Sequence, residues 1–194
     1  SSQVLVDFLR DSSGTTTVAA VLLTMRLFAE ERQSGTLVLL FTSPVREVEI
    51  VLGKFISAFV VLSRLVLASV YLPALIFVNG KVSLGHIASG YLGLLMVGAA
   101  TLSLGVLGSA LARTQIMAGV LAAVFIFILF LCWALSRVVD PPLSTVISHF
   151  SLYEQHFFPS MRGLLQLSDV AYYASVTYLA LLASTRVIQS QRWQ

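Results

Sequence analysis

The segment from Glu30 to Phe55 reads EERQSGTLVLLFTSPVREVEIVLGKF and carries seven charged residues. The whole chain of 194 residues has only 12 basic and 9 acidic side chains, so this one segment holds a third of them. An apolar run, 37–41, divides the charges into two groups. Because charged side chains are almost never buried without a partner, the segment is predicted to lie outside the apolar body of the protein.

The remainder of the chain is too apolar for an ordinary soluble domain. Hydrophobic residues make up 57% and charged residues 11%, whereas about 25% of residues are charged in an average soluble domain. The windows 87–112 and 114–136 contain no charge and are long enough to cross the hydrocarbon of a bilayer as helices. The composition therefore predicts an all-α integral membrane protein, and the net charge of +3 is expected to orient the chain rather than to bind nucleic acid.

Five membrane spans are predicted, with one charged connection and one outer segment between them. The spans are 15–28, 53–78, 86–112, 114–136 and 170–185; the charged connection is 30–54, the segment 137–168 is expected to form extracellular or re-entrant helices, and 186–194 is a tail. The alternating topology puts seven basic residues on one side, Arg26, Arg32, Arg46, Lys54, Arg113, Arg186 and Arg192, against Arg10, Lys81, Arg137 and Arg162 on the other. The positive-inside tendency makes the side with seven cytoplasmic, and the C-terminus with it.

This topology places the N-terminal end of the sequence outside the cell, although no signal peptide is visible. One further span before the sequence begins would remove the difficulty. We therefore expect six spans in all, with both ends in the cytoplasm.

The charged connection is predicted to form an amphipathic helical elbow. Ser43 is a good N-cap and Pro44 a good first helical residue, so a helix is expected to begin at Pro44. Its apolar face is predicted to be Val45, Val48, Leu52 and Phe55. The run 37–41 is too short to span a bilayer. The elbow either lies in the membrane interface and ties two spans together, or it is a docking surface for a soluble subunit.

Three stretches resemble one family of membrane proteins. LLTMRLFAEERQSGTLVLLFTSPVREVEIVLGKF, 22–55, is similar to the corresponding region of ABC-2 type transporter permeases, and most of all to the gliding-motility-associated or nitrous-oxide-reductase-maturation group. GYLGLLMVGAATLSLGVLGSALARTQ, 90–115, and the C-terminal SDVAYYAS and QSQRW also resemble parts of these permeases. The resemblance covers the chain from about Leu22 to its end.

The resemblance implies an ABC-2 transmembrane domain of the type V exporter kind. It implies a multi-pass permease of the bacterial inner membrane, paired with a second copy or a related permease, surrounded by lipid and sometimes by accessory subunits. A separate ATPase subunit would supply ATP and Mg²⁺, and export would be the usual direction. The residues implied to couple to the ATPase are Glu30, Glu31, Arg32, Gly35, Thr36, Ser43, Pro44, Arg46 and Glu47.

No catalytic, cofactor or metal site is predicted in this chain. Neither Gly53-Lys54 nor Gly80-Lys81 has the glycine and hydroxyl spacing of a phosphate-binding loop, so ATP would be hydrolysed by another chain. His149, Glu154 and His156 do not have a convincing metal-ligand spacing. The protein is therefore not expected to be an enzyme by itself.

Arg64 is an arginine inside a predicted span. It follows Lys54 by ten residues, about 15 Å along a regular helix. An arginine at such depth costs at least about 2.5 kcal/mol unless it is paired or hydrated. Arg64 either bonds to backbone carbonyls and extends toward the interface, or it lines a hydrated path, meets an anionic substrate group or contacts another subunit.

A stripe of small residues marks one face of the predicted span 86–112. It consists of Gly98, Thr101, Gly105, Gly108 and Ala112. Such a face lets another helix approach closely, so packing against a neighbour or a symmetry mate is favoured over lining the transport path.

Two other functions stay open on the sequence alone. One is a membrane scaffold or signalling subunit that is driven by an ATPase without moving a substrate. The other is an ATP-independent channel or carrier, which only Arg64 supports. The substrate cannot be deduced from the sequence.

Overall fold

The computed structural model describes residues 2–36, 45–73, 84–136 and 166–192. Every regular element in these ranges is a helix: α1 (Ser2–Thr24), α2 (Ala29–Ser34), α4 (Glu47–Ala68), α6 (Leu84–Leu111), α7 (Gln115–Ser136) and α10 (Leu167–Arg192). The all-α part of the fold prediction is therefore confirmed for the described residues. Of the expected outer segment 137–168, only 166–168 is described, and His149, Glu154 and His156 lie outside the described residues.

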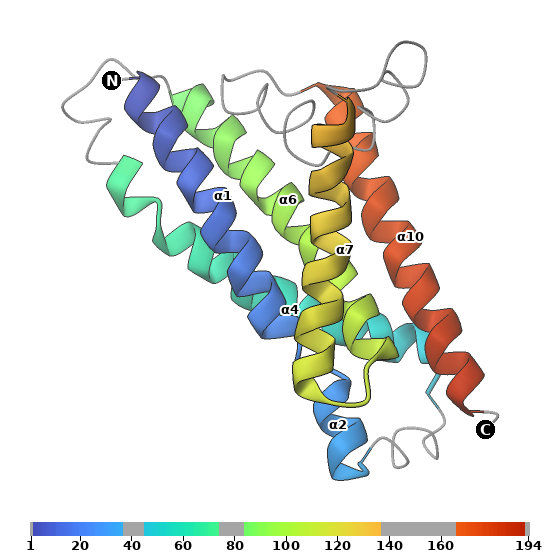
Figure 1. Ribbon diagram of the computed structural model, residues 1–194. Coiled ribbons are helices and arrows are strands. Elements are labelled where there is room, and N and C mark those ends of the chain that lie inside the picture. The colour runs from blue at the N-terminus through green and yellow to red at the C-terminus, as the bar shows by residue number, and fades with distance from the viewer. Residues whose placement is uncertain (1, 37–44, 74–83, 137–165, 193–194) are drawn as a thin grey trace.

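The five long helices form a bundle in which α6 is central (Figure 1). α1, α6 and α10 run toward the end of the bundle that carries α2, whereas α4 and α7 run away from it. α4 crosses the others more obliquely than they cross one another. The most apolar window of α6 is 67% buried, against 22% for that of α4. The bundle therefore covers α6 and leaves most of α4 uncovered within a single chain.

α1 packs along α6 because glycines on α6 leave room for its side chains. A methyl group added at Gly90 would lie 2.5 Å from Leu9 Cδ1, and one added at Gly105 would lie 2.1 Å from Thr24 Oγ1. The two helices are therefore parallel and in close contact over most of their length.

The first helix is longer than expected. The sequence predicts a span at 15–28, but α1 begins at Ser2 and ends at Thr24. The segment before residue 15 was left out of the predicted span because it contains Asp7 and Asp11. In the structure both carboxylates are exposed on one face of the helix, and Leu5 and Leu9 on the opposite face are fully buried. An amphipathic helix can extend through such a segment because only one of its faces needs to be apolar.

α4 also differs from expectation at its start. The predicted N-cap Ser43 and first residue Pro44 lie outside the described residues, and the helix begins at Glu47 with Arg46 as its N-cap. The Glu49 carboxylate accepts a hydrogen bond of 3.3 Å from the Arg46 backbone N–H, which is one half of a capping box. The local hydrogen bond therefore supports a start at Glu47.

The predicted apolar face of this helix is not the face that packs on α6, although Phe55 is partly buried. Val48 is 50% exposed and Leu52 40% exposed. The buried stripe is Val51, Ala58, Leu62 and Val66, which lies on the side of α6. Several faces of this segment are equally apolar, so periodicity alone could not select the one that packs.

Two helices among the described residues are long and apolar enough to cross a membrane, Glu47–Pro73 and Gly85–Leu111. The helix Gln115–Leu131 is apolar but shorter. The expected five spans correspond to five long helices, and the number that cross a membrane stays a prediction.

α6 and α7 lie in close contact at Gly108, which gives a stability prediction. A methyl group at Gly108 would lie 2.8 Å from the backbone nitrogen of Ala122, whereas one at Gly53 would have no atom within 4 Å. Because backbone cannot move aside cheaply, Gly108→Ala is expected to cost about 1–3 kcal/mol, and Gly53→Ala to be neutral or stabilising. Thermal unfolding in detergent measures both. Equal shifts of Tm in the two variants would contradict the packing.

Candidate functional site

The richest polar contacts in the described part of the chain gather where α2 meets the ends of three long helices. We call this site the α2 junction. It consists of Phe28, Ala29, Glu31, Arg32, Lys54, Ser109, Ala110, Ala112 and Gln191. Phe28 and Ala29 are buried together with the last turns of α6, in small apolar clusters.

Ser109 caps the beginning of α2 from another helix. The residue at the N-cap of α2, Phe28, has no side chain that can accept a hydrogen bond. The Ser109 hydroxyl oxygen instead accepts from the backbone N–H of Phe28 at 3.0 Å and from that of Ala29 at 3.2 Å. The first N–H groups of a helix need such partners when they are buried. α2 is therefore fixed to the last turn of α6.

Arg32 ties α2 to the ends of α6 and α10. Its guanidinium donates to the carbonyl oxygen of Ala112 at 2.9 Å and to that of Ala110 at 3.1 Å, and also to Gln191 Oε1. Gln191 Nε2 in turn donates to the Ala110 carbonyl at 3.2 Å. A cation at this position also suits the negative end of the α6 dipole.

The environment of Arg32 is partly desolvated. Burial, and then the nearby positive charge of Arg113, lower the pKa of Arg32 from its ordinary value. The three acceptors oppose this effect because they favour the charged guanidinium. Arg32 therefore needs its carbonyl partners in order to remain at this position at low cost.

Lys54 ties α2 to α4. Its ammonium lies 2.6 Å from Glu31 Oε1 and donates a hydrogen bond to the Leu27 carbonyl. It also lies 4.8 Å from the centre of the Phe28 ring, within the range of a cation–π contact. The second oxygen of Glu31, Oε2, is buried and has no hydrogen-bond partner within the described part of the chain. Lys54 is thus the cation that this carboxylate depends on.

The other residues predicted to couple to an ATPase lie at the surface. Glu30, Thr36 and Arg46 are exposed, and Glu47 is partly exposed. Gly35 ends α2 in the left-handed conformation at φ 75°, which glycine adopts without strain. Ser43 and Pro44 lie outside the described residues.

A shallow hollow lies beside the junction. Its volume is about 430 Å³, and it is lined by Arg26, Leu27, Glu30, Glu31, Ser34, Thr36 and Lys54. It therefore offers both signs of charge to a polar partner.

Three residues of the junction were not predicted from the sequence as site residues. They are Lys54, Ser109 and Gln191, whose partners are 27, 80 to 81 and 81 residues away in the chain. Ser109 is hidden among small residues, and nothing in its local pattern distinguishes it from a packing serine. Lys54 could have been singled out from the sequence, because it directly precedes the uncharged stretch 55–63.

The remaining predicted site residues lie within the bundle and on its surface. Arg64 is exposed on α4. A methyl group at Gly98 would meet Leu62 and Thr16, Gly105 lies against α1, and Gly108 lies against α7. The Thr101 hydroxyl donates to the Val97 carbonyl at 2.9 Å, and Ala112 is fully buried. The small-residue stripe therefore faces helices of its own chain.

Comparison with known proteins gives a family match over most of the chain. Residues 13–185 match the family model described as ABC-2 family transporter protein. No curated protein and no solved structure matches. The matched range contains about half of α1, all of α2, α4, α6 and α7, and much of α10.

Proposed function

The chain belongs to the ABC-2 transporter family, and from that premise we propose that it is a permease subunit in which the α2 junction transmits the motion of a separate ATPase to the membrane helices. Membership of this family makes the chain a multi-pass membrane component rather than the ATPase itself. The observation that carries the proposal is the set of contacts that fixes the short helix α2 to α6, α10 and α4 at once.

The contacts divide the charged residues into two groups. Arg32 and Glu31 face inward, to α6, α10 and Lys54. Glu30 and Arg46 remain exposed on the outer surface. We assign the inward group to transmission within the permease and the exposed group to contact with the ATPase.

A displacement of α2 would then move the ends of α6 and α10 with it. Hydrogen bonds to charged groups contribute about 1.5–3 kcal/mol each, and Arg32 makes three such bonds. The link to α4 is a partly buried ion pair. ATP drives the change only if the ATPase, once loaded, binds one arrangement of the permease better than the other.

The finer features of the proposal follow the resemblance and the charge distribution. The α2 end of the bundle carries the more basic loops and is proposed to be cytoplasmic. We further propose the bacterial inner membrane, outward movement of substrate, and kinship with the gliding-motility or nitrous-oxide-reductase-maturation group. ATP and Mg²⁺ would bind to the partner ATPase.

Capture of the ATPase in mild detergent tests the docking surface. Arg46→Glu is expected to reduce the amount of ATPase that co-purifies by about tenfold or more, because like charges placed together at an interface cost several kcal/mol. Arg10→Glu is the matched control, since Arg10 is also exposed but lies in the half of α1 that is farther from α2. Undiminished capture with Arg46→Glu would rule out a docking role for the start of α4. A wild-type complex without an ATPase chain would contradict the proposed function as a whole.

A further inference from the structure

We propose that the cavity between α1 and α4 within one chain binds an amphiphile with an alkyl chain and a cationic amine head, and that such amines are a substrate class of the permease. The role as a substrate site rests on the proposed function. The binding itself rests only on the shape, the polarity and the nearby charge of the cavity.

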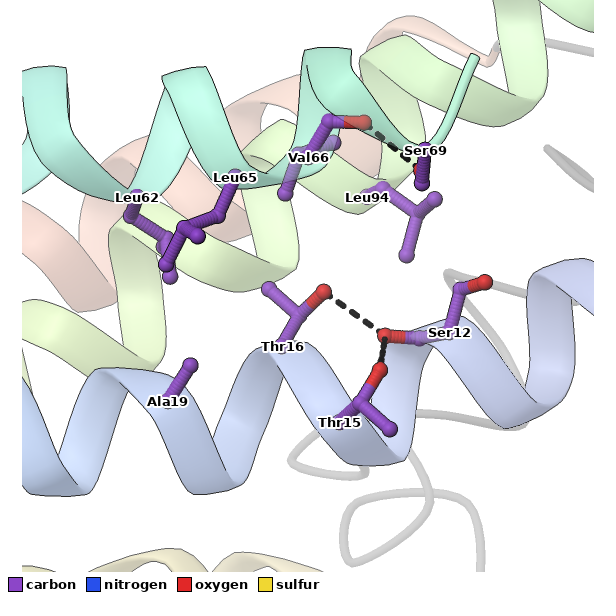
Figure 2. Close-up of a pocket in the computed structure, with 9 residues that line it drawn as sticks. All are labelled: Ser12, Thr15, Thr16, Ala19, Leu62, Leu65, Val66, Ser69 and Leu94. Carbon is purple, nitrogen blue, oxygen red and sulfur yellow. Dashed lines mark hydrogen bonds between the residues drawn. The ribbon is translucent and has the colours of Figure 1, made fainter. Parts of the chain in front are cut away.

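The cavity has a polar end and an apolar end. Its volume is about 220 Å³, and Leu94 of α6 lines it together with residues of α1 and α4. Figure 2 shows Ser12 facing Ser69 at one end, and Ala19 and Leu62 at the other. Ser12 and Ala19 are seven residues apart, so the two ends are separated by roughly 10 Å along α1. This shape matches a molecule with a polar head and a short apolar chain.

The cavity is open at the surface of the bundle. Thr15 of α1 and Leu65 of α4 both line it and are both exposed. α4 is long and apolar enough to cross a membrane, so a molecule dissolved in lipid could enter sideways between the two helices. The volume is below the roughly 300–1,000 Å³ of pockets that enclose drug-sized ligands, which favours a single chain over a bulky ring system.

The polar end offers hydrogen-bond acceptors. The hydroxyls of Thr15 and Thr16 donate to the Ser12 carbonyl at 2.9 and 2.7 Å, and the Ser69 hydroxyl donates to the Val66 carbonyl at 2.7 Å (Figure 2). Each hydroxyl has one proton, so these three present only lone pairs to the cavity. The Ser12 hydroxyl has no partner among the described residues and can rotate to accept as well. An ammonium head, which carries only donors, suits this end better than a carboxylate or a phosphate.

α6 fixes the position of the Ser69 hydroxyl. The hydroxyl of the buried Tyr91 lies 3.0 Å from Ser69 Oγ. Because Ser69 already donates to the Val66 carbonyl, Tyr91 is the donor between the two hydroxyls, and one lone pair of Ser69 remains for a ligand. The acceptor at this end of the cavity is therefore held in place before any ligand binds.

A carboxylate lies beside the polar end. Asp11 directly precedes Ser12 and is four residues before Thr15, so Asp11 and Thr15 are neighbours on one side of α1. Asp11 is exposed and forms no ion pair with another described residue. A carboxylate on a helix that packs along a membrane span is costly without a partner. Asp11 therefore supplies the counter-charge for a cationic head that sits among the hydroxyls.

The arginines of the two helices near the cavity point away from it. Arg10 is nine residues before Ala19, or two and a half helical turns, and so lies on the opposite side of α1. Arg64 is two residues after Leu62 and is exposed on the far side of α4. Asp11 is therefore the charge that a head at the polar end would meet, and that charge attracts a cation.

Photolabelling of the full-length permease with its ATPase, in lipid nanodiscs without ATP, tests the binding. The probe is decylamine with a diazirine at the end of its alkyl chain, and the matched probe is decanoate with the same diazirine. The amine is expected to label the peptides around Ala19 and Leu62, and an excess of plain decylamine is expected to abolish this labelling. The decanoate probe is expected to give about one tenth of the competable labelling or less.

Two exposed surfaces control for probe that is merely dissolved in lipid. Val124 of α7 and Leu179 of α10 are exposed apolar side chains. Labelling around them is expected to be alike for the amine and the decanoate probes, and an excess of decylamine is not expected to reduce it. Competition confined to the α1 and α4 peptides therefore identifies a saturable site.

Substitutions at neighbouring positions test the role of the carboxylate. Asp11→Asn is expected to lower the competable labelling by the amine about tenfold or more, because a charged contact is lost. Arg10→Gln is the matched control, since it also removes an exposed charge from α1, and it is expected to leave the labelling unchanged. Asp11→Lys is expected to reverse the preference, so that decanoate labels the site and decylamine does not. A misfolded chain could not gain this new preference.

Three results would overturn the inference. They are labelling around Ala19 and Leu62 that excess decylamine does not reduce, equal competable labelling by the two probes, and the same loss in Arg10→Gln as in Asp11→Asn. The role as a substrate site has its own readout, because decylamine is expected to raise ATP hydrolysis by the wild-type complex but not by Asp11→Asn. Binding without any effect on hydrolysis would overturn that role.

Capture of the ATPase separates these results from failure of the proposed function. A complex that keeps its ATPase but shows no competable labelling contradicts only the amine site. A permease that never binds an ATPase contradicts the proposed function, whereas labelling measured on it without ATP still decides whether the cavity binds the amine.

Discussion

Arg32→Ala is expected to abolish most of the ATP-dependent response of the membrane helices while the ATPase still binds. The variant removes the bonds from α2 to the Ala110 and Ala112 carbonyls and to Gln191. The exposed residues assigned to docking are unchanged. We therefore expect stimulation of ATPase activity by the permease to fall by about tenfold or more, as loss of one charged hydrogen bond alone corresponds to about 1.5–3 kcal/mol, with ATPase capture within about twofold of wild type.

Two variants serve as controls for Arg32→Ala. Arg113→Ala removes a neighbouring exposed cation and is expected to leave the stimulation intact. Arg32→Lys keeps the charge but cannot reproduce the planar fork that reaches two carbonyls, so it is expected to restore only part of the response. If Arg32→Ala behaves like Arg113→Ala, the junction does not transmit motion.

Lys54→Met is expected to give the second largest effect, on stability. It leaves both oxygens of Glu31 without their cation, one of them already buried without a partner. The pair is partly buried, so the loss is expected to lie between the values for exposed and buried pairs, at about 2 kcal/mol. Thermal unfolding in detergent measures the loss.

A double-mutant cycle isolates the ion pair from the other contacts of Lys54. Glu31→Gln alone and the double variant Lys54→Met with Glu31→Gln complete the cycle. We expect the double variant to be more stable than the sum of the single losses predicts, by about 1 kcal/mol. Additive losses would show that Lys54 acts only through the Leu27 carbonyl and the Phe28 ring.

The sequence predicted the class of the fold because that class depends on composition and local pattern. Uncharged windows and the motif at 22–55 were enough for a helical membrane protein of the ABC-2 kind, and the family match agrees. The alternating direction of the long helices also follows from the order of the predicted spans (Figure 1). These features require no knowledge of which side chains meet.

The features that the sequence did not predict depend on tertiary contacts. The first half of α1 was not predicted as part of a span because it contains Asp7 and Asp11. An average hydropathy counts such charges whichever face of the helix they occupy. The face of α4 that packs in the bundle was not predicted because Val48 and Val51 are alike in sequence, and only contact with α6 distinguishes them.

The α2 junction shows the same limit. Arg32 was grouped with the residues that couple to the ATPase because the resemblance to ABC-2 permeases implied it. Its acceptors are backbone carbonyls 78 to 80 residues away, and every residue has a carbonyl. No residue-type pattern could have identified them.

Hydrogen exchange of the assembled complex tests most directly whether α2 drives the membrane helices. Wild-type permease and Arg32→Ala are compared, each with its ATPase, with and without trapped ATP. In the wild type, ATP is expected to change exchange in 28–34 and in the last turns of α6 and α10, 108–112 and 188–192. In Arg32→Ala the change is expected to remain in 28–34 and to disappear from the other two regions. The same response of α6 and α10 in both proteins, or a wild-type response confined to α2, would contradict the account.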